Sequence, residues 1–254
     1  MRTLNALILI AFLGFLSQSC ISPEPNKKAG GQSTANPPEG ENNSSVTLRA
    51  VHLSPDAPNV DIYVNNNRVI NNLPYYGSSS FLSLNGSNIN ARINPVNSGT
   101  SVINAEVSLE GNHNTIFALN NVSSLETLIV ADDRNSPGFG QIKVRVIHAV
   151  SVVGTVDVYV LDSTDNCTDL SLSVPALTSV PFKGVSPYLT IASGTYDVCV
   201  ALSGSSSPAI VAQDVVLSSG SVSTIIAANA KNDFASFGFI VLDDLGVNSP
   251  VLLY

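Results

Sequence analysis

The chain has 254 residues, with 11 Lys and Arg against 19 Asp and Glu, and a formal net charge of −8 at pH 7. This acidic balance excludes a nucleic-acid-binding protein and disfavours electrostatic adhesion to anionic lipid, because both need clustered positive charge. The residues are 44% hydrophobic but only 12% charged and 6% aromatic, a composition that suits a secreted β-protein.

The first residues predict a targeting segment. Arg2 supplies a positive start, and residues 4–16 form an apolar stretch of signal-peptide length. The stretch is too short for a membrane-spanning helix, which needs about 20 apolar residues. Residues 16–20, Leu-Ser-Gln-Ser-Cys, resemble a bacterial lipoprotein cleavage box, with the leucine one position further from the cysteine than usual. We therefore expect residues 1–19 to be a signal peptide and Cys20 to be lipidated, with ordinary secretion as the alternative.

Residues 20–45 predict a flexible tether. They are rich in Pro, Gly, Ser, Asn and Lys and have almost no large apolar side chain, so they cannot bury enough surface to fold. A flexible chain of about 25 residues has a root-mean-square span of about 25–30 Å. A lipid at Cys20 followed by this tether predicts a protein anchored to the outer membrane of a cell envelope and exposed at the surface.

After the tether the sequence repeats itself. Residues 49–52 (RAVH) and 61–64 (DIYV) recur as residues 145–148 (RVIH) and 157–160 (DVYV), both at an offset of 145 − 49 = 96. A repeat of this length matches a whole small domain rather than a solenoid unit. The predicted domains are 46–135 and 142–254, joined by a linker over 136–141.

The second copy contains an insertion. The Leu-Pro-Tyr-Tyr-Gly turn at 73–77 aligns with residues 180–184 at an offset of 184 − 77 = 107, so 107 − 96 = 11 residues have been gained within 161–180. Cys167 lies in the insertion and Cys199 on a predicted strand. In an oxidising compartment, two cysteines without a histidine cluster indicate one disulfide. Two buried free thiols are the alternative.

An alternation of period two predicts β-strands almost throughout. It is clear at residues 46–53, 60–64, 89–93 and 144–147. The three asparagines at 65–67 predict a tight turn between strands, because Asn tolerates positive φ. Each copy is expected to hold about seven or eight short strands and to form an immunoglobulin-like β-sandwich, so the predicted fold class is all-β.

One segment points to a family. Residues 52–64, His-Leu-Ser-Pro-Asp-Ala-Pro-Asn-Val-Asp-Ile-Tyr-Val, followed by the 73–77 turn, resemble the signature of a bacterial family known as domain of unknown function 4397. In the second copy, Ser-Val-Val-Gly-Thr at 151–155 replaces Ser-Pro-Asp-Ala-Pro, although His148 and the 157–160 strand remain. The resemblance implies secreted or surface-anchored β-domains, often in tandem, without an assigned reaction.

The equivalent histidines, His52 and His148, have two interpretations. One is a metal ligand or general base near Asp56 and Asp61. The other is a structural residue that ends the first strand and hydrogen-bonds the following turn. The second copy favours the structural role, because it keeps the histidine and the strand aspartate but has no counterpart of Asp56. We predict no catalytic residue, no metal and no cofactor.

Two further groups are binding candidates. Asp132-Asp133 and Asp243-Asp244 follow the last strand of each copy, and clustered oxygen ligands suit calcium, although such residues more often form a solvated turn. In the Pro-Tyr-Tyr-Gly turn, Tyr75 is expected to plug the sandwich end and Tyr76 to be exposed for contact.

These observations predict a non-catalytic envelope lipoprotein that binds an extracellular protein or glycan. The candidate binding residues are Tyr76, Asp56, Asp61 and His52. A structural envelope component without a soluble ligand is the main alternative. A hydrolase or metal-binding domain that uses His52, Asp56 and Asp61 is a minor one. Specific binding is expected where the two copies differ.

Overall fold

The computed structural model describes residues 45–162, 167–231, 236–246 and 251–253. These residues all belong to one compact unit, Glu41–Tyr254. The predicted signal peptide, the tether and the lipidation candidate Cys20 lie outside the described residues. In the described part, no helix has the length and hydropathy needed to cross a membrane.

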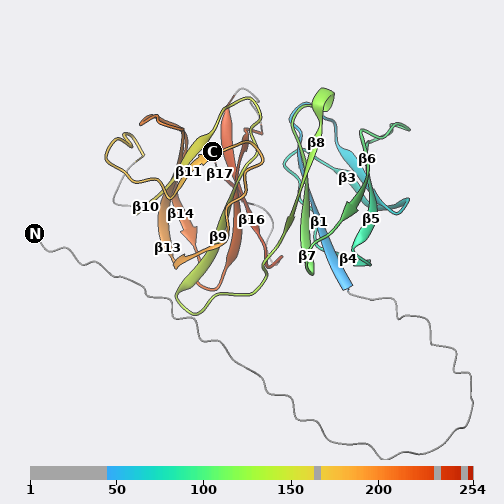
Figure 1. Cartoon of the computed structure of the whole chain (residues 1–254), viewed down its shortest axis with the longest axis horizontal. Coiled ribbons are helices and arrows are strands. Elements are labelled where there is room, and N and C mark those ends of the chain that lie inside the picture. Colours follow the sequence, from blue (N-terminus) through green and yellow to red (C-terminus); the bar gives the residue numbers. More distant parts are fainter. Residues whose placement is uncertain (1–44, 163–166, 232–235, 247–250, 254) are drawn as a thin grey trace, which may run out of the picture. The chain divides into compact units, whose positions relative to one another are not determined.

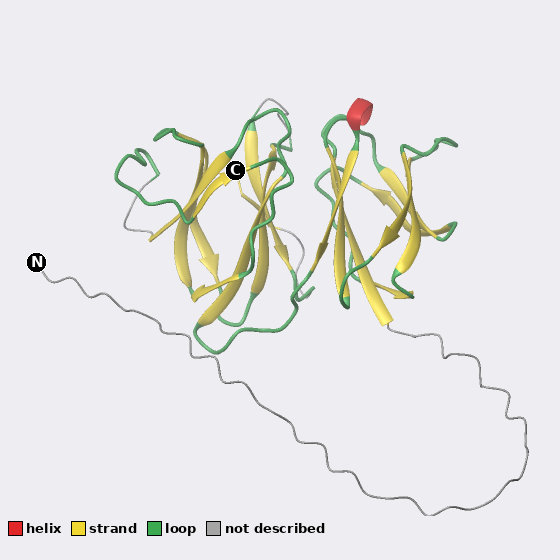
Figure 2. Ribbon diagram, viewed as in Figure 1, coloured by secondary structure: helices red, strands yellow, loops and turns green. Residues whose placement is uncertain are grey.

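The chain folds into two β-sandwiches, which confirms the predicted all-β fold class (Figures 1 and 2). Apart from strands, the described ranges contain one short 3-10 turn, η1 (Val122–Ser124). The strands of the first sandwich are β1 (Ser45–Leu53), β2 (Val60–Val64), β3 (Asn67–Leu73), β4 (Leu82–Asn85), β5 (Asn88–Pro95), β6 (Ile103–Ser108), β7 (His113–Leu119) and β8 (Glu126–Ala131). The strands of the second are β9 (Gln141–His148), β10 (Val156–Asp162), β11 (Leu177–Val180), β12 (Leu189–Ala192), β13 (Gly194–Leu202), β14 (Pro208–Leu217), β15 (Val222–Asn229), β16 (Phe237–Asp243) and β17 (Val251–Leu253).

Each sandwich has an inner sheet, which contacts the other sandwich, and an outer sheet. The inner sheets have the strand orders β4-β1-β7-β8 and β12-β9-β15-β16-β17. The outer sheets have the orders β3-β2-β5-β6 and β11-β10-β13-β14. In both inner sheets the first strand of the copy runs parallel to a central partner, β1 with β7 and β9 with β15, whereas the other strand pairs are antiparallel. The sequence repeat is therefore a repeat of topology.

The inner sheets are buried on both faces. Along β1, Leu48 and Ala50 point into the first sandwich core, whereas Val51 and Leu53 join a separate cluster on the opposite face. Alternate side chains of a strand point to opposite faces, so a strand that is buried on both sides is apolar without a polar face. The alternation along β1 thus places side chains of one strand in two cores.

The separate cluster is a shared core between the two sandwiches. It combines buried side chains from both inner sheets, and Phe117, Leu119, Ile147 and Ile226 are 0% exposed. At about 25 cal/mol per Å² of buried apolar surface, such a cluster contributes substantially to holding the two copies together. The full set is Val51, Leu53, Tyr76, Phe117, Leu119, Val130, Ile147, Ala149, Ile226, Ala228, Ile240 and Leu242.

The predicted asparagine turn is confirmed. Asn65 and Asn66, with φ of 49° and 67°, connect β2 to β3. Positive φ at both central residues is the geometry of the tight hairpin turns that match strand twist.

The Pro-x-x-Gly turns close against the first strand of each copy. Gly77 N–H donates to the carbonyl oxygen of Pro74 at 2.8 Å, and Tyr76 has a φ of 66°. A Cβ atom at Gly77 would lie 2.6 Å from that same oxygen, so only glycine fits. Lys183 and Gly184 repeat this geometry in the second copy, with φ of 62° at Lys183.

Candidate functional site

The histidine of the first copy shapes the turn that follows β1. His52 is 1% exposed, and its Nε2 lies 3.1 Å from the carbonyl oxygen of Pro58. The backbone N–H of Ser54 donates to Nδ1 at 3.3 Å. Because a carbonyl oxygen only accepts, these partners assign the proton to Nε2 and a neutral ring. Both ring nitrogens therefore bond the Ser-Pro-Asp-Ala-Pro turn.

The histidine of the second copy is placed in the same way. Nε2 of His148 lies 3.2 Å from the carbonyl oxygen of Gly154, six residues along the chain, as Pro58 is from His52. Burial lowers the pKa of both histidines, and the contact with the carbonyl oxygen opposes that effect. Two neutral, buried rings at equivalent positions have the geometry of scaffold residues.

The aspartates predicted beside His52 have separate partners. Asp56 accepts a hydrogen bond from the backbone N–H of Val122 at 2.8 Å, which ties its turn to η1. Asp61 accepts one from the backbone N–H of Asn72 at 2.8 Å and another from Arg68 at 3.1 Å. The hydrolase or metal-binding interpretation requires His52, Asp56 and Asp61 to share one site. Instead, each of the three side chains bonds a different part of the backbone.

The strand aspartate has an identifiable structural task. Asn72, bonded by Asp61, has a φ of 56°, and the pairing of β2 with β3 shifts register at this place. In the second copy, Asp157 accepts from the backbone N–H of Ser179 at 2.7 Å, and Ser179 has a φ of 52°. The Asp of Asp-x-Tyr-Val therefore satisfies a backbone donor that is displaced from the sheet ladder by a bulge.

The prediction of an exposed Tyr76 is wrong. Tyr76 is 5% exposed and belongs to the shared core between the sandwiches. Its hydroxyl donates to the carbonyl oxygen of Asn229 in the second sandwich, and the Tyr75 hydroxyl donates to the same oxygen at 2.9 Å. Local sequence could not place Tyr76, because the surface that buries it comes from the other copy.

Two buried ion pairs connect the two sandwiches. Arg49 donates to Asp244 of the second sandwich at 2.6 Å, and Arg145 donates in the reverse direction to Asp132 of the first. All four side chains are at most 4% exposed. Each arginine is also held by its own sandwich, where its Nε donates to a threonine hydroxyl. These threonines are Thr115, at 3.0 Å from Arg49, and Thr224, at 2.7 Å from Arg145.

These ion pairs show that Asp132 and Asp244 are buried ion-pair partners and not solvated turn residues, whereas Asp133 and Asp243 are partly exposed. Asp132 and Asp244 are the equivalent residues, because each accepts from the threonine of its own inner sheet, at 2.7 Å and 2.6 Å. The two acidic pairs therefore correspond with a shift of one residue, Asp132 to Asp244. Burial raises the pKa of Asp244, while Arg49 and Arg145 oppose that rise. The carboxylates of Asp244 and Asp132 already accept hydrogen bonds from Arg49 and Arg145. Among the described residues, no group of three or more His, Cys, Asp or Glu could hold a metal ion.

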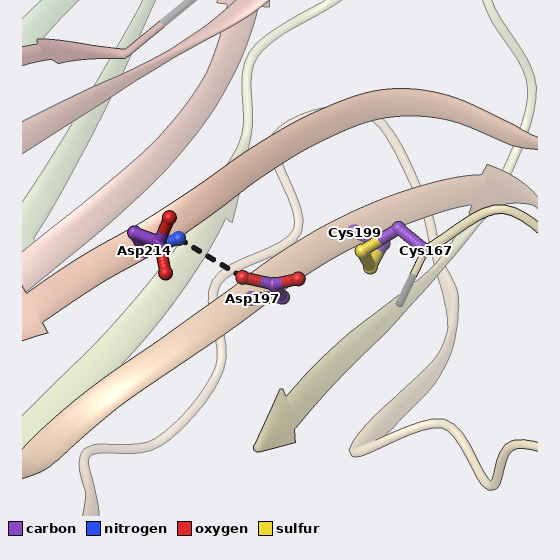
Figure 3. Close-up of a disulfide and its surroundings, with 4 residues drawn as sticks. All are labelled: Cys167, Asp197, Cys199 and Asp214. Atoms are coloured by element: carbon purple, nitrogen blue, oxygen red, sulfur yellow. Dashed lines mark hydrogen bonds between the residues drawn. A yellow bond between two sulfur atoms is a disulfide. The ribbon is translucent and has the colours of Figure 1, made fainter. Parts of the chain in front are cut away.

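The insertion of the second copy covers that copy's outer sheet. A disulfide joins Cys167 in the insertion to Cys199 on β13 (Figure 3). Leu170 is 2% exposed, and its backbone N–H donates to the carbonyl oxygen of Ser206 at 2.9 Å. Side chains of the insertion and of the outer sheet together form a small apolar cluster. It consists of Tyr159, Leu161, Cys167, Leu170, Cys199 and Ala201, with Val211 packed against it. We call this the covered face.

The corresponding outer sheet of the first copy carries a polar face. Tyr63, the counterpart of Tyr159, is partly exposed, and the guanidinium of Arg92 lies 4.5 Å from its ring centroid. Amide and carboxylate groups surround this pair, and Arg68, Asn104 and Glu106 are exposed. We call this the open face. It consists of Asp61, Tyr63, Arg68, Asn90, Arg92, Asn94, Asn104 and Glu106.

A polar hollow lies beside Asp132, one of the ion-pair residues. It has a volume of about 290 Å³ and is lined by Asn112, His113, Asp132, Arg134 and Asn135. Its charged groups already have partners. The Nε of Arg134 donates to the carbonyl oxygen of Asp244 at 2.9 Å, and Nδ1 of His113 lies 2.7 Å from the hydroxyl of Thr47.

The sequence profile of one family, described as a domain of unknown function (DUF4397), matches residues 46–159 and 162–250. The chain belongs to this family. The boundary between the two matches falls within β10. No curated protein matches the chain.

Solved structures show distant similarity to this DUF4397 protein. A family 26 carbohydrate-binding module from Eubacterium rectale Amy13K, solved with maltoheptaose, has 12% identity and a TM-score of 0.25, covering 78% of this chain and 97% of its own. A family 41 carbohydrate-binding module from streptococcal virulence factors has 10% identity and a TM-score of 0.24, covering 74% and 95%. A leucine-rich repeat protein from Bacteroides thetaiotaomicron has 12% identity and a TM-score of 0.17, covering 71% and 26%. These similarities are too distant to assign a ligand.

The DUF4397 signature in this chain consists of scaffold residues. The histidine bonds a turn, the strand aspartate bonds a bulge, and the Pro-x-x-Gly turn brings an aromatic residue into the shared core. Tyr63 is the exception, because it points to the outer face and its surroundings differ between the copies.

Proposed function

We propose that this DUF4397 protein is a non-catalytic binding protein tethered to the cell envelope, and that the open face of its first sandwich takes an extracellular partner. One observation carries the proposal. The same outer face is sealed by a disulfide-anchored insertion in the second copy and left open in the first. We therefore assign a scaffold role to the covered second copy and the binding role to the open face of the first.

The candidate histidines and aspartates are each held by structural partners and are not gathered in one site, which supports a binding role. His52 and His148 are buried in turns, and Asp132 and Asp244 are paired with arginine. A general base or nucleophile needs a reachable position beside its substrate, and these groups are enclosed by their structural partners.

The anchoring part of the proposal rests on the sequence. A lipid on Cys20 and the tether over residues 20–45 would hold the paired sandwiches at the outer membrane. Replacement by Cys20→Ser should move the protein from the membrane fraction to the soluble fraction of cell extracts. A variant that remains in the membrane fraction would contradict lipid anchoring.

Site-specific crosslinking tests the binding surface. We place a photo-reactive amino acid at Asn104 on the open face and, as a matched control, at Asn112, which is also exposed in the same sandwich but lies outside this face. Illumination of intact cells should yield an adduct, to protein or glycan, from position 104 only. Equal adducts from both positions, or none from 104, would reject the open face as the binding surface.

A structural envelope component is a second candidate, favoured by the insertion. Leu172 and Val174 are 97% and 85% exposed on this disulfide-anchored segment. Exposed apolar side chains on an anchored loop suit contact with another protein. The variant Leu172→Ser/Val174→Ser should release the chain from an envelope complex on native gels if this candidate is correct, and should leave its migration unchanged if it is not.

A further inference from the structure

We infer that the open face binds a neutral carbohydrate chain, and that the protein binds one such chain per molecule. This inference rests on the proposed function and names the class of its ligand.

The open face presents its side chains in a continuous row. Strand pairing sets Tyr63 opposite Arg68 on one side and opposite Arg92 on the other, and Arg92 opposite Asn104. The row thus crosses all four strands, a width of about 14 Å at the usual strand spacing. Such a row suits an extended ligand that lies across the strands.

Tyr63 is the apolar element of the row. Its ring is held by the guanidinium of Arg92, 4.5 Å from the ring centroid, so the tyrosine is positioned without a ligand. An aromatic ring with a polar hydroxyl suits a ligand that has both C–H faces and hydroxyl groups, as a sugar ring has.

Amide and carboxylate groups extend the row. The amide of Asn90 donates to Asn104 and to Glu106, each at 3.0 Å. Asn side chains offer both donors and acceptors, and Glu offers acceptors, so together they complement hydroxyl groups, which donate and accept. Two buried atoms of the face, Arg92 Nε and Asn94 Oδ1, have no hydrogen-bond partner among the described residues. Both atoms are buried, so the groups that a ligand on this face can reach are the exposed amide of Asn104 and the exposed carboxylate of Glu106.

The charge of the face is balanced. Arg68 and Arg92 are matched by Asp61 and Glu106, and the Arg68–Asp61 pair is a direct contact at 3.1 Å. A nucleic acid or an acidic polysaccharide needs an excess of positive charge, which this face does not have. A protein partner is better served by a central apolar cluster, and Tyr63 is the one aromatic side chain of the open face. Neutral carbohydrate fits best.

The second copy lacks an equivalent site. Tyr159, the counterpart of Tyr63, is 5% exposed because the insertion and the disulfide lie over it. This burial predicts one carbohydrate chain per protein, although the fold is duplicated.

Titration with defined oligosaccharides tests the inference. The full chain, purified in a detergent without a sugar headgroup, is titrated calorimetrically with neutral hexasaccharides of glucose, xylose and N-acetylglucosamine, and with a galacturonic acid hexamer as the charged comparison. We expect at least one neutral hexamer to bind with a stoichiometry of one. Affinity should fall roughly tenfold or more in Tyr63→Ala and in Asn104→Ala/Glu106→Ala, the loss expected when stacking or several hydrogen bonds are removed.

The matched control is Asn112→Ala/Glu110→Ala, which removes the same side-chain types from exposed positions of the first sandwich outside the open face. It should bind like the unmodified chain, and circular dichroism should show all variants folded. No binding of any neutral hexamer, two equivalent sites per chain, or full binding by the open-face variants would overturn the inference. If no hexamer binds but position 104 still forms a protein adduct in cells, the carbohydrate inference fails while the proposed function stands. If position 104 forms no adduct either, both fail.

Discussion

At the scale of single residues, the junction between the sandwiches depends on charges that neither sandwich can satisfy completely. Arg49 finds a hydroxyl in its own sheet and a carboxylate in the other sandwich, and Arg145 mirrors this arrangement. A buried ion pair often adds little net stability compared with an apolar pair, yet removal of one partner leaves a buried charge without compensation.

Loss of one junction arginine should therefore be severe. We expect Arg49→Met to lower the free energy of unfolding by about 3–5 kcal/mol, because Asp244 would remain buried without its guanidinium. Removal of the more exposed pair of Lys183 with Glu126, by Glu126→Gln, should cost about 1 kcal/mol or less. Urea unfolding measures both. The double variant Arg49→Met/Asp244→Leu should recover much of the loss, and equal costs for the buried and exposed pairs would contradict this account.

The buried histidines predict a loss of stability in mild acid. Removal from water is the main reason why the pKa values of His52, His113 and His148 lie below the ordinary value of 6.5. The unfolded chain therefore binds more protons than the folded chain just below this value. The stabilisation is complete above about pH 6.5 and falls as the pH drops, by up to about 1.4 kcal/mol per pH unit for each of the buried His52 and His148 and by less for the partly exposed His113.

Urea unfolding between about pH 7.5 and pH 5.5 measures this dependence in a window above the titration of ordinary carboxyl groups. The variant His52→Asn/His148→Asn should show a shallower slope, because His113 is then the one remaining histidine that contributes. A slope identical to that of the unmodified chain would show that these two histidines are not buried in the neutral form.

At the scale of elements, one insertion separates two otherwise similar sandwiches. The outer sheet of the first copy meets solvent with polar side chains, whereas that of the second has an apolar outer face that needs a cover. The insertion supplies this cover, and the disulfide limits the freedom of the covering segment in the unfolded chain.

Removal of the disulfide should destabilise the second sandwich. For the 32-residue separation of Cys167 and Cys199, the chain-entropy relation gives about 3–4 kcal/mol. In the variant Cys167→Ser/Cys199→Ser, hydrogen exchange should become faster in β10 and β13, beneath the insertion, and stay unchanged in β2 and β5 of the open face. Unchanged protection of β10 and β13 would mean that the cover holds without its covalent bond.

At the scale of the whole molecule, the shared core predicts that the two copies unfold as one cooperative unit. Each inner sheet presents an apolar second face, and each sandwich alone would expose that face together with one member of each ion pair. A short linker between domains usually permits relative motion, but a large apolar interface with buried charges opposes it.

Calorimetry tests this cooperativity. The full chain should unfold in a single thermal transition, because loss of one sandwich exposes the apolar face of the other. The junction variant Ile147→Asp/Ile226→Asp should split the transition in two, since both side chains are 0% exposed within the shared core. Two transitions in the unmodified chain would show that the sandwiches unfold independently.

Much of the fold was predictable because it depends on local patterns. Alternation identifies the strands, and Asn65 and Asn66 adopt the positive φ that their position in the hairpin indicated. The Cys167–Cys199 pairing followed from their being the two cysteines that come after Cys20. The burial of Tyr76 did not follow, because the residues that cover it lie about 150 positions later in the chain.

The sequence by itself determined that this protein is a duplicated all-β chain with an insertion in its second copy, since periodicity, turn residues and repeats are properties of neighbouring residues. Only the tertiary structure decided which faces are covered. Asp132 and Asp244 look like solvated turn residues in sequence and are buried ion-pair partners in space. Tyr63 and Tyr159 occupy the same motif, yet one lies on an open face and the other under the insertion. Burial is set by contacts between segments distant in the chain, and these contacts decide which of two identical side chains remains available to a ligand.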